Sequence, residues 1–209
     1  MESVQSQILV RMRRGPTKVH IGKDFLDLGS RSAVDLALYR LAKNNVIQRV
    51  GRGLYYIPRV NPRLGIEWVP DIQEIALALA RQTGSRAVPS GAVAANSLGL
   101  STQVPARPVY LTDGRTRRVR VGNTVISFRH VSPKDLPLGS VLTVLVFQAL
   151  RHLGQKDVGA ETIERVRRRL LPVDRRRLIK ETHHVTDWVA AIVRNICIDE
   201  EIPNGTRHG

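Results

Sequence analysis

The sequence contains little cysteine and few aromatic residues. Cys197 is the only cysteine among 209 residues, and Phe, Trp and Tyr together make up 4%. A single cysteine excludes an internal disulfide and a zinc site built from cysteines, and it fits a reducing compartment. Because Ile196 and Ile198 flank it, we interpret Cys197 as a buried structural thiol. The core must be built mainly from Val, Leu, Ile and Ala.

Long apolar runs are also absent. The longest, residues 141–150, is interrupted by Thr143 and Gln148 and is about half the length that crosses a membrane. The first 15 residues lack the apolar core of a signal peptide. We therefore expect a cytoplasmic protein that does not enter a membrane.

Acidic residues are scarce relative to basic ones. The chain has 33 Lys and Arg against 18 Asp and Glu, a net charge of +15 and a pI of about 11.2. Such an excess indicates a polyanionic partner, and nucleic acid is the commonest. Codon bias can explain why Arg replaces Lys, but it does not explain the excess of bases over acids.

The stretch 29–45 has the pattern of an amphipathic helix. Ser30 or Ser32 can cap its start, and Asn44-Asn45 can end it, because Asn tolerates a left-handed backbone. One face repeats apolar residues at the spacing of a buried helical stripe: Val34, Ala37, Leu38 and Leu41. The opposite face is polar and cationic: Ser32, Asp35, Leu36, Tyr39, Arg40 and Lys43.

A basic β-hairpin is expected directly after this helix. Two β-prone runs, 46–50 and 54–57, are joined through Gly51-Arg52-Gly53. A helix and then a hairpin is the order of a winged helix-turn-helix, in which the helix enters the DNA major groove and the wing lies along the phosphates. The preceding residues fit this order, with a helix at 3–14, a strand at 17–21 and a brief helix at 22–28.

Charge around the hairpin supports contact with DNA phosphates. Arg49, Arg52 and Arg59 surround it, with Tyr55 and Tyr56 beside them. The alternative is a solvated basic loop with tyrosine packed on the helix. Residues 1–60 contain 11 Lys and Arg against four acids, a net charge of +7, so we expect DNA affinity to fall steeply with salt.

The rest of the chain is expected to form a second domain. A proline-rich linker at 61–70 separates a winged helix at 1–60 from a mixed α/β domain at 71–200, followed by a flexible tail at 201–209. The fold class is therefore α+β. The second domain is expected to contain two helices (71–83, 90–98), two β segments (108–112, and 119–131 folded back at Gly122-Asn123) and four helices (140–153, 159–171, 173–182, 186–197).

Two further groups of basic residues admit more than one interpretation. The first lies on the second hairpin: Arg115, Arg117, Arg118 and Arg120, with Arg129 on the return arm. Strand alternation places Arg118 and Arg120 on one face, which is either a second phosphate or acidic-partner surface or a solvated face. The arginine-rich run 164–181 is interpreted as a solvated helix pair, with a docking surface as the alternative.

Nothing in the sequence indicates a metal site, a cofactor or catalysis. His183 and Asp187 lie four residues apart, but His184 points to another helix face and no third ligand is near. Gly51-x-Gly53 lacks the rest of a nucleotide-binding loop. No Ser/His/Asp set or paired carboxylate stands out, so we expect no enzymatic activity.

Two segments resemble a known family. ALYRLAKNNVIQRVGRGLYYIPR (37–59) and AANSLGLSTQVPARPVYLTDG (94–114) are similar to the AbiEi-like antitoxins of type IV toxin–antitoxin systems, and the resemblance covers most of residues 1–150. It implies repression of the protein's own operon through a winged helix bound to operator DNA. It also implies a C-terminal domain that counters a nucleotidyltransferase-like toxin without necessarily forming a stable complex with it.

The resemblance also implies which residues contact DNA: Ser32, Tyr39, Arg40, Arg49, Arg52 and Tyr55. It assigns antitoxicity to no residue. We therefore expect a bacterial DNA-binding antitoxin and autorepressor. The alternatives are a plain winged-helix regulator whose second domain binds a ligand or dimerises, and an RNA-binding or RNA-modifying enzyme that uses the arginine-rich helices.

Overall fold

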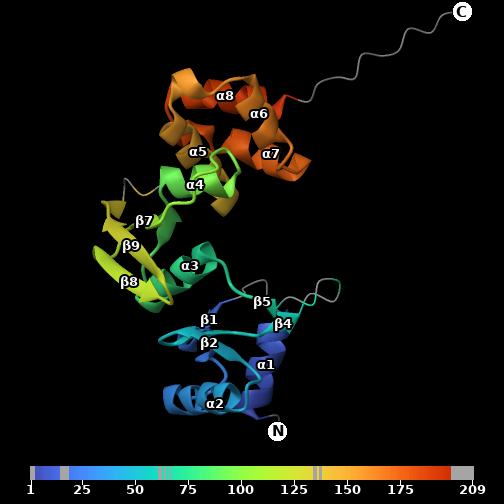
Figure 1. The fold of residues 1–209 in the computed structure, drawn as a ribbon, viewed down its shortest axis with the longest axis vertical. Helices are drawn as coiled ribbons and strands as arrows, with labels where there is room; N and C mark the ends of the chain where they lie inside the picture. Colours follow the sequence, from blue (N-terminus) through green and yellow to red (C-terminus); the bar gives the residue numbers. More distant parts are fainter. Residues whose placement is uncertain are drawn as a thin grey trace, which may run out of the picture. The chain divides into compact units, whose positions relative to one another are not determined.

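The chain folds into two compact units, one of mixed α and β structure and one of helices (Figure 1). The computed structural model describes residues 3–14, 19–60, 63, 65, 67–133, 136 and 138–198. The N-terminal unit comprises residues 1–88 and 106–136, and the helical unit comprises residues 89–105 and 137–209. Helix and strand contents agree with the expected α+β class. The expected tail at 201–209 lies outside the described residues.

The first half of the N-terminal unit contains a helical group and a three-stranded antiparallel sheet. Its elements are α1 (Val4–Arg14), β1 (His20–Ile21), the 3₁₀ helix η1 (Gly22–Phe25), α2 (Arg31–Lys43), β2 (Gln48–Gly51) and β3 (Leu54–Tyr56). The strand order is β1-β3-β2. Residues 17 and 18 of the expected first strand lie outside the described residues. The expected helix at 22–28 is a single 3₁₀ turn, closed by the Asp24 carboxylate, which accepts a bond from the Ile21 amide at 3.0 Å.

The expected apolar face of α2 is confirmed. Its four predicted core residues are buried, and they pack with Ile8 and Met12 of α1. Ser30, and not Ser32, caps the helix, because its hydroxyl accepts a bond from the Ala33 amide. Asn45 has a φ of 56°, which confirms the left-handed ending. Arg11 adds a two-fold salt bridge to Asp27, and these hydrogen bonds lower the pKa of Asp27.

A second sheet completes the N-terminal unit. Its elements are α3 (Ile72–Gln82), β6 (Ala87–Pro89), β7 (Val109–Thr112), β8 (Arg117–Val121) and β9 (Thr124–His130). The strand order is β6-β7-β9-β8, with β7 parallel to β9 and β8 antiparallel to β9. The turn at Gly122-Asn123 is confirmed, and Gly122 has a φ of 56°. Strand β6 was not expected from the sequence.

Helix α3 is attached to the three-stranded sheet rather than separated from it. The Arg81 guanidinium donates to the Val19 carbonyl at 2.9 Å and to the Asp24 carboxylate at 3.4 Å. Gln82 Nε2 donates to the Arg52 carbonyl at 2.8 Å. The compact units thus divide the chain elsewhere than at 61–70. Within that expected linker, residues 61, 62, 64 and 66 lie outside the described residues, and β4 (Arg59–Val60) pairs with β5 (Glu67–Trp68).

Removing the cap of α3 should destabilise this attachment. The Asp71 carboxylate accepts a bond from the Glu74 amide at 2.7 Å. We expect Asp71→Ala to lower the free energy of unfolding by about 1 kcal/mol, measured by urea unfolding of the full chain. Asp71→Asn keeps the accepting oxygen and should lower the free energy of unfolding by only a few tenths of a kcal/mol. Equal losses in both variants would instead assign the effect to the carboxylate charge at the helix N-terminus.

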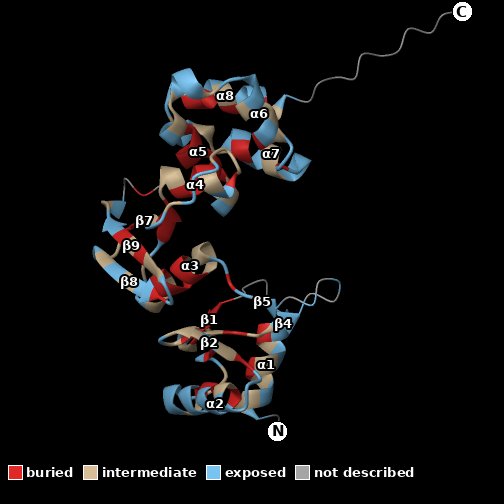
Figure 2. Cartoon of the chain, viewed as in Figure 1, coloured by how far each residue is buried: buried red, intermediate tan, exposed pale blue. Residues whose placement is uncertain are grey.

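The helical unit is organised around α5 (Figure 2). Its elements are α4 (Gly91–Ser97), α5 (Val141–Leu153), η3 (Gln155–Asp157), α6 (Ala160–Arg167), α7 (Pro172–Lys180), η4 (Thr182–His184) and α8 (Asp187–Cys197). Every residue from 143 to 150 is buried, as its apolar sequence predicts. Helix α4 packs so closely on α5 that a Cβ at Gly91 would lie 2.9 Å from the Gln148 carbonyl.

No helix in the described part of the chain has the length and apolar character needed to cross a membrane.

Candidate nucleic-acid interface

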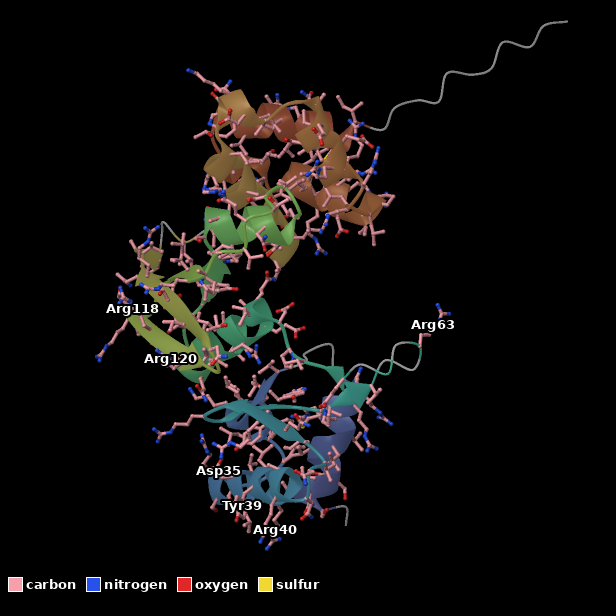
Figure 3. The ribbon with its side chains drawn as sticks, in the orientation of Figure 1. Asp35, Tyr39, Arg40, Arg63, Arg118 and Arg120 are labelled. Carbon is pink, nitrogen blue, oxygen red and sulfur yellow. The ribbon has the colours of Figure 1, made fainter. Side chains whose placement is uncertain are left out.

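The outward face of α2 is a continuous exposed surface. Burial of the opposite stripe turns six side chains to solvent, as the helical pattern predicts: Ser32, Asp35, Leu36, Tyr39, Arg40 and Lys43. Tyr39 is 58% exposed and Leu36 47%. Asp35, Tyr39 and Arg40 are labelled on this face in Figure 3. The surface therefore combines hydrogen-bonding groups with apolar atoms, the two kinds of contact that read base edges in a major groove.

The charged residues in the C-terminal half of α2 favour contact with phosphate groups. Arg31 Nε donates to the Asp35 carboxylate at 2.8 Å, so the one acidic group on this face is already paired. Arg40 and Lys43 make no ion pair with any described residue. They can therefore neutralise phosphates without first giving up an internal partner.

The β2–β3 hairpin presents one exposed arginine at its tip. Arg52 and Gly53 form the turn, and Gly53 has a φ of 69°, which favours glycine. Because Gln82 holds the Arg52 carbonyl, the backbone of the tip is fixed while the Arg52 side chain is exposed. A fixed backbone with a projecting guanidinium suits contact with DNA phosphates.

The two hairpin tyrosines have different surroundings. Tyr55 is partly buried against the α1–α2 core, and the Arg49 guanidinium lies 5.8 Å from the centroid of its ring. Tyr56 is buried and donates to Gln48, whose amide donates to Glu67 at 2.9 Å. Burial and the Glu67 carboxylate raise the pKa of Tyr56. Tyr56 is thus a structural residue, whereas Arg49 is exposed beside Tyr55.

The second basic group is divided between the two faces of β8. Arg118 and Arg120 are exposed and extend from the strand (Figure 3), as alternation predicts. Arg117 turns the other way, where its guanidinium donates to the Leu79 carbonyl at 2.7 Å and lies 5.0 Å from the centroid of the Phe128 ring. Arg115 precedes the strand and is exposed. These residues belong to a different sheet from the β2–β3 hairpin.

The arginines of the run 164–181 are mostly exposed, as a solvated helix pair predicts, but some of them also bond to other elements. Several donate to carbonyls at the C-terminal ends of α4 and α8: Arg165 to Gly99, Arg169 to Ser97, and Arg167 to Asn195 and Ile196. A guanidinium there satisfies free carbonyls and complements the helix dipole. These hydrogen bonds could not be predicted from the sequence, because local periodicity cannot reveal partners 28 or more residues away.

The described residues include no group of three His, Cys, Asp or Glu side chains that could hold a metal. His183 and His184 lie with ring centroids 3.8 Å apart, and His183 Nδ1 is 2.8 Å from the Lys180 carbonyl. Cys197 is partly buried, with its Sγ 3.5 Å from the Arg175 carbonyl.

The chain belongs to a family of unknown function, DUF6088, whose family model matches residues 6–178. The match runs from α1 into α7 and so includes α2, the β2–β3 hairpin and the three described sheets. No curated protein matches the chain.

Proposed function

We propose that this protein binds duplex DNA through the outward face of α2 and the β2–β3 hairpin, as a winged helix-turn-helix does. The observation that supports this most is the order and exposure of the two elements. A helix with six exposed residues on one face is followed directly by a hairpin with an exposed arginine at its tip. In this proposal α2 lies in the major groove and Arg49 and Arg52 contact phosphates.

We propose further that the protein is an antitoxin that represses its own operon when it is bound to this DNA. This part depends on the resemblance of residues 37–59 and 94–114 to AbiEi-like antitoxins. In this role the protein represses its own operon and counters a nucleotidyltransferase-like toxin through the chain beyond the DNA-binding surface. A plain transcriptional regulator would use the same DNA surface but would not protect against a toxin.

DNA binding is tested with the full chain and two fluorescent duplexes of equal length and composition. One duplex contains the sequence upstream of the protein's own coding region, and the other is a scrambled version of it. We expect the upstream duplex to bind at least about 10³-fold more tightly, with an affinity that falls steeply between about 50 and 200 mM salt. Equal affinity for both duplexes would contradict specific operator binding.

The antitoxin role needs a separate assay. The full chain is co-expressed with the adjacent gene, and growth is compared with expression of that gene alone. Rescue by the full chain supports the antitoxin role. If the adjacent gene is toxic and the full chain does not counter it, the antitoxin role is wrong and the plain transcriptional regulator is favoured.

Replacing Tyr39 should separate base recognition from phosphate contact. Tyr39 is exposed on α2, and Arg52 lies at the hairpin tip. We expect Tyr39→Ala to lower the ratio of operator to scrambled affinity about 10-fold, the effect of one base contact. Arg52→Ala should weaken both duplexes alike and lower the salt slope by about 1. Losses independent of sequence in both variants would remove α2 from base recognition.

A further inference from the structure

A pocket of about 560 Å³ lies in the N-terminal unit, and its described lining residues differ from those proposed to contact DNA. It lies where the last turn of α3 meets the loop between β7 and β8. Seven residues line it: Thr83, Ser85, Thr112, Gly114, Arg115, Thr116 and Arg117. Its volume is within the range of small-molecule sites.

The loop that forms one wall of the pocket is held by its own hydrogen bonds. The Gly114 amide donates to Thr112 Oγ1 at 3.0 Å, and the Gly114 carbonyl lies 2.8 Å from His130 Nδ1. A Cβ at Gly114 would collide with the Ser85 hydroxyl, so only glycine lets Ser85 approach this loop. The wall is therefore preorganised, which lowers the entropic cost of binding a ligand.

The electrostatics of the pocket favour an anion. The described residues that line it include two guanidinium groups and no carboxylate. The carbonyls at the end of α3 would repel an anion, but they already accept bonds: Leu79 from Arg117 at 2.7 Å and Ala80 from Thr83 Oγ1 at 3.0 Å. The neighbouring Asp113 carboxylate accepts the Arg86 amide at 2.8 Å.

Several donors of the pocket remain for a ligand. Arg115 is exposed and forms no hydrogen bond or ion pair with other residues in the described ranges. The hydrogen bonds of Arg117 to Leu79 and Thr83 both come from Nη2. The Nε and Nη1 groups of the guanidinium can therefore donate to a ligand. Thr116 Oγ1 accepts the His130 amide at 2.9 Å, so its proton can be donated. Guanidinium and hydroxyl donors together are the groups that bind phosphate.

We propose that this pocket binds the phosphate group of a small phosphate monoester. Two guanidinium charges match the charge of about −2 on such a group near neutral pH. The volume exceeds that of a phosphate ion and leaves room for an organic part. Because no aromatic side chain is found among the described lining residues, that part is of the sugar type rather than a stacked base. A phosphate of the DNA backbone has related chemistry and is the competing source.

The test measures binding of ribose 5-phosphate, inorganic phosphate and ribose to the full chain by calorimetry. We expect saturable binding of ribose 5-phosphate with a Kd of about 1 mM or lower, weaker binding of inorganic phosphate and none of ribose. Arg115→Gln combined with Thr116→Val should weaken the ribose 5-phosphate Kd at least about 10-fold. The matched control is Arg118→Gln, which removes the same charge from the outer face of β8 and should leave the Kd unchanged.

Three results would overturn the proposal: no saturable binding, equal binding of ribose, or equal weakening by the control. The double variant is also measured with duplex DNA. Loss of DNA affinity without loss of ribose 5-phosphate binding would assign these residues to DNA phosphates and contradict a small-molecule site. Unchanged DNA affinity with lost ribose 5-phosphate binding supports it. Both outcomes are independent of whether α2 binds an operator.

Discussion

Replacing Arg40, Lys43 and Arg52 together by glutamine should weaken binding of the full chain to duplex DNA by about 10²- to 10³-fold near 0.1 M salt. Each of these side chains is exposed on α2 or at the hairpin tip. If each neutralises one phosphate, the slope of log K against log salt should also fall by about 3. Fluorescence anisotropy over a series of salt concentrations measures both quantities on one duplex.

The matched control removes three charges from the other sheet. Arg118, Arg120 and Arg129 are exposed on β8 and β9, so replacing them by glutamine changes the net charge equally. We expect this variant to keep most of its DNA affinity. If both variants lose affinity equally, either the total charge or the β8–β9 surface is responsible, and the assignment to α2 and the hairpin is wrong.

The second large effect concerns the two hydrophobic cores. Leu38 is fully buried on the inner face of α2, and Phe147 is 2% exposed in α5 of the helical unit. Leu38→Ala should lower the free energy of unfolding by about 2–5 kcal/mol, and Phe147→Ala by about 3–5 kcal/mol. Because each unit has its own core, we expect Leu38→Ala to abolish DNA binding on mild warming and Phe147→Ala to leave it intact.

Urea unfolding and DNA binding are therefore measured on the same two variants. Fluorescence of labels placed in each unit reports which unit unfolds first. The expectation fails if Phe147→Ala removes DNA binding at a temperature where the label in the N-terminal unit still reports a folded state.

The elements of this fold that depend on local pattern could be predicted from the sequence. The period of α2 identified both its buried stripe and its exposed residues, and the glycines at 51 and 53 identified the hairpin turn. The sequence predicts a helix over 140–153, and α5 confirms it. In each case the determining residues lie within a few turns or strands of one another.

The parts that escaped prediction depend on contacts between distant residues. The attachment of α3 to the first sheet uses Arg81 and Gln82, whose partners lie 30 to 62 residues earlier. The inward orientation of Arg117 depends on the Leu79 carbonyl and the Phe128 ring. A long arginine side chain can hydrogen-bond equally well to water, to a DNA phosphate or to the carbonyls at a helix end. The sequence pattern alone therefore does not predict its partner.

Hydrogen exchange of the full chain with and without its upstream duplex is the most direct test of the DNA-binding surface. Amide exchange along the full chain is followed by mass spectrometry at a salt concentration where the scrambled duplex does not bind. We expect slower exchange in residues 31–43 and 48–56 when the upstream duplex is added. Slower exchange confined to residues 117–130 or 160–180, with 31–56 unchanged, would contradict it.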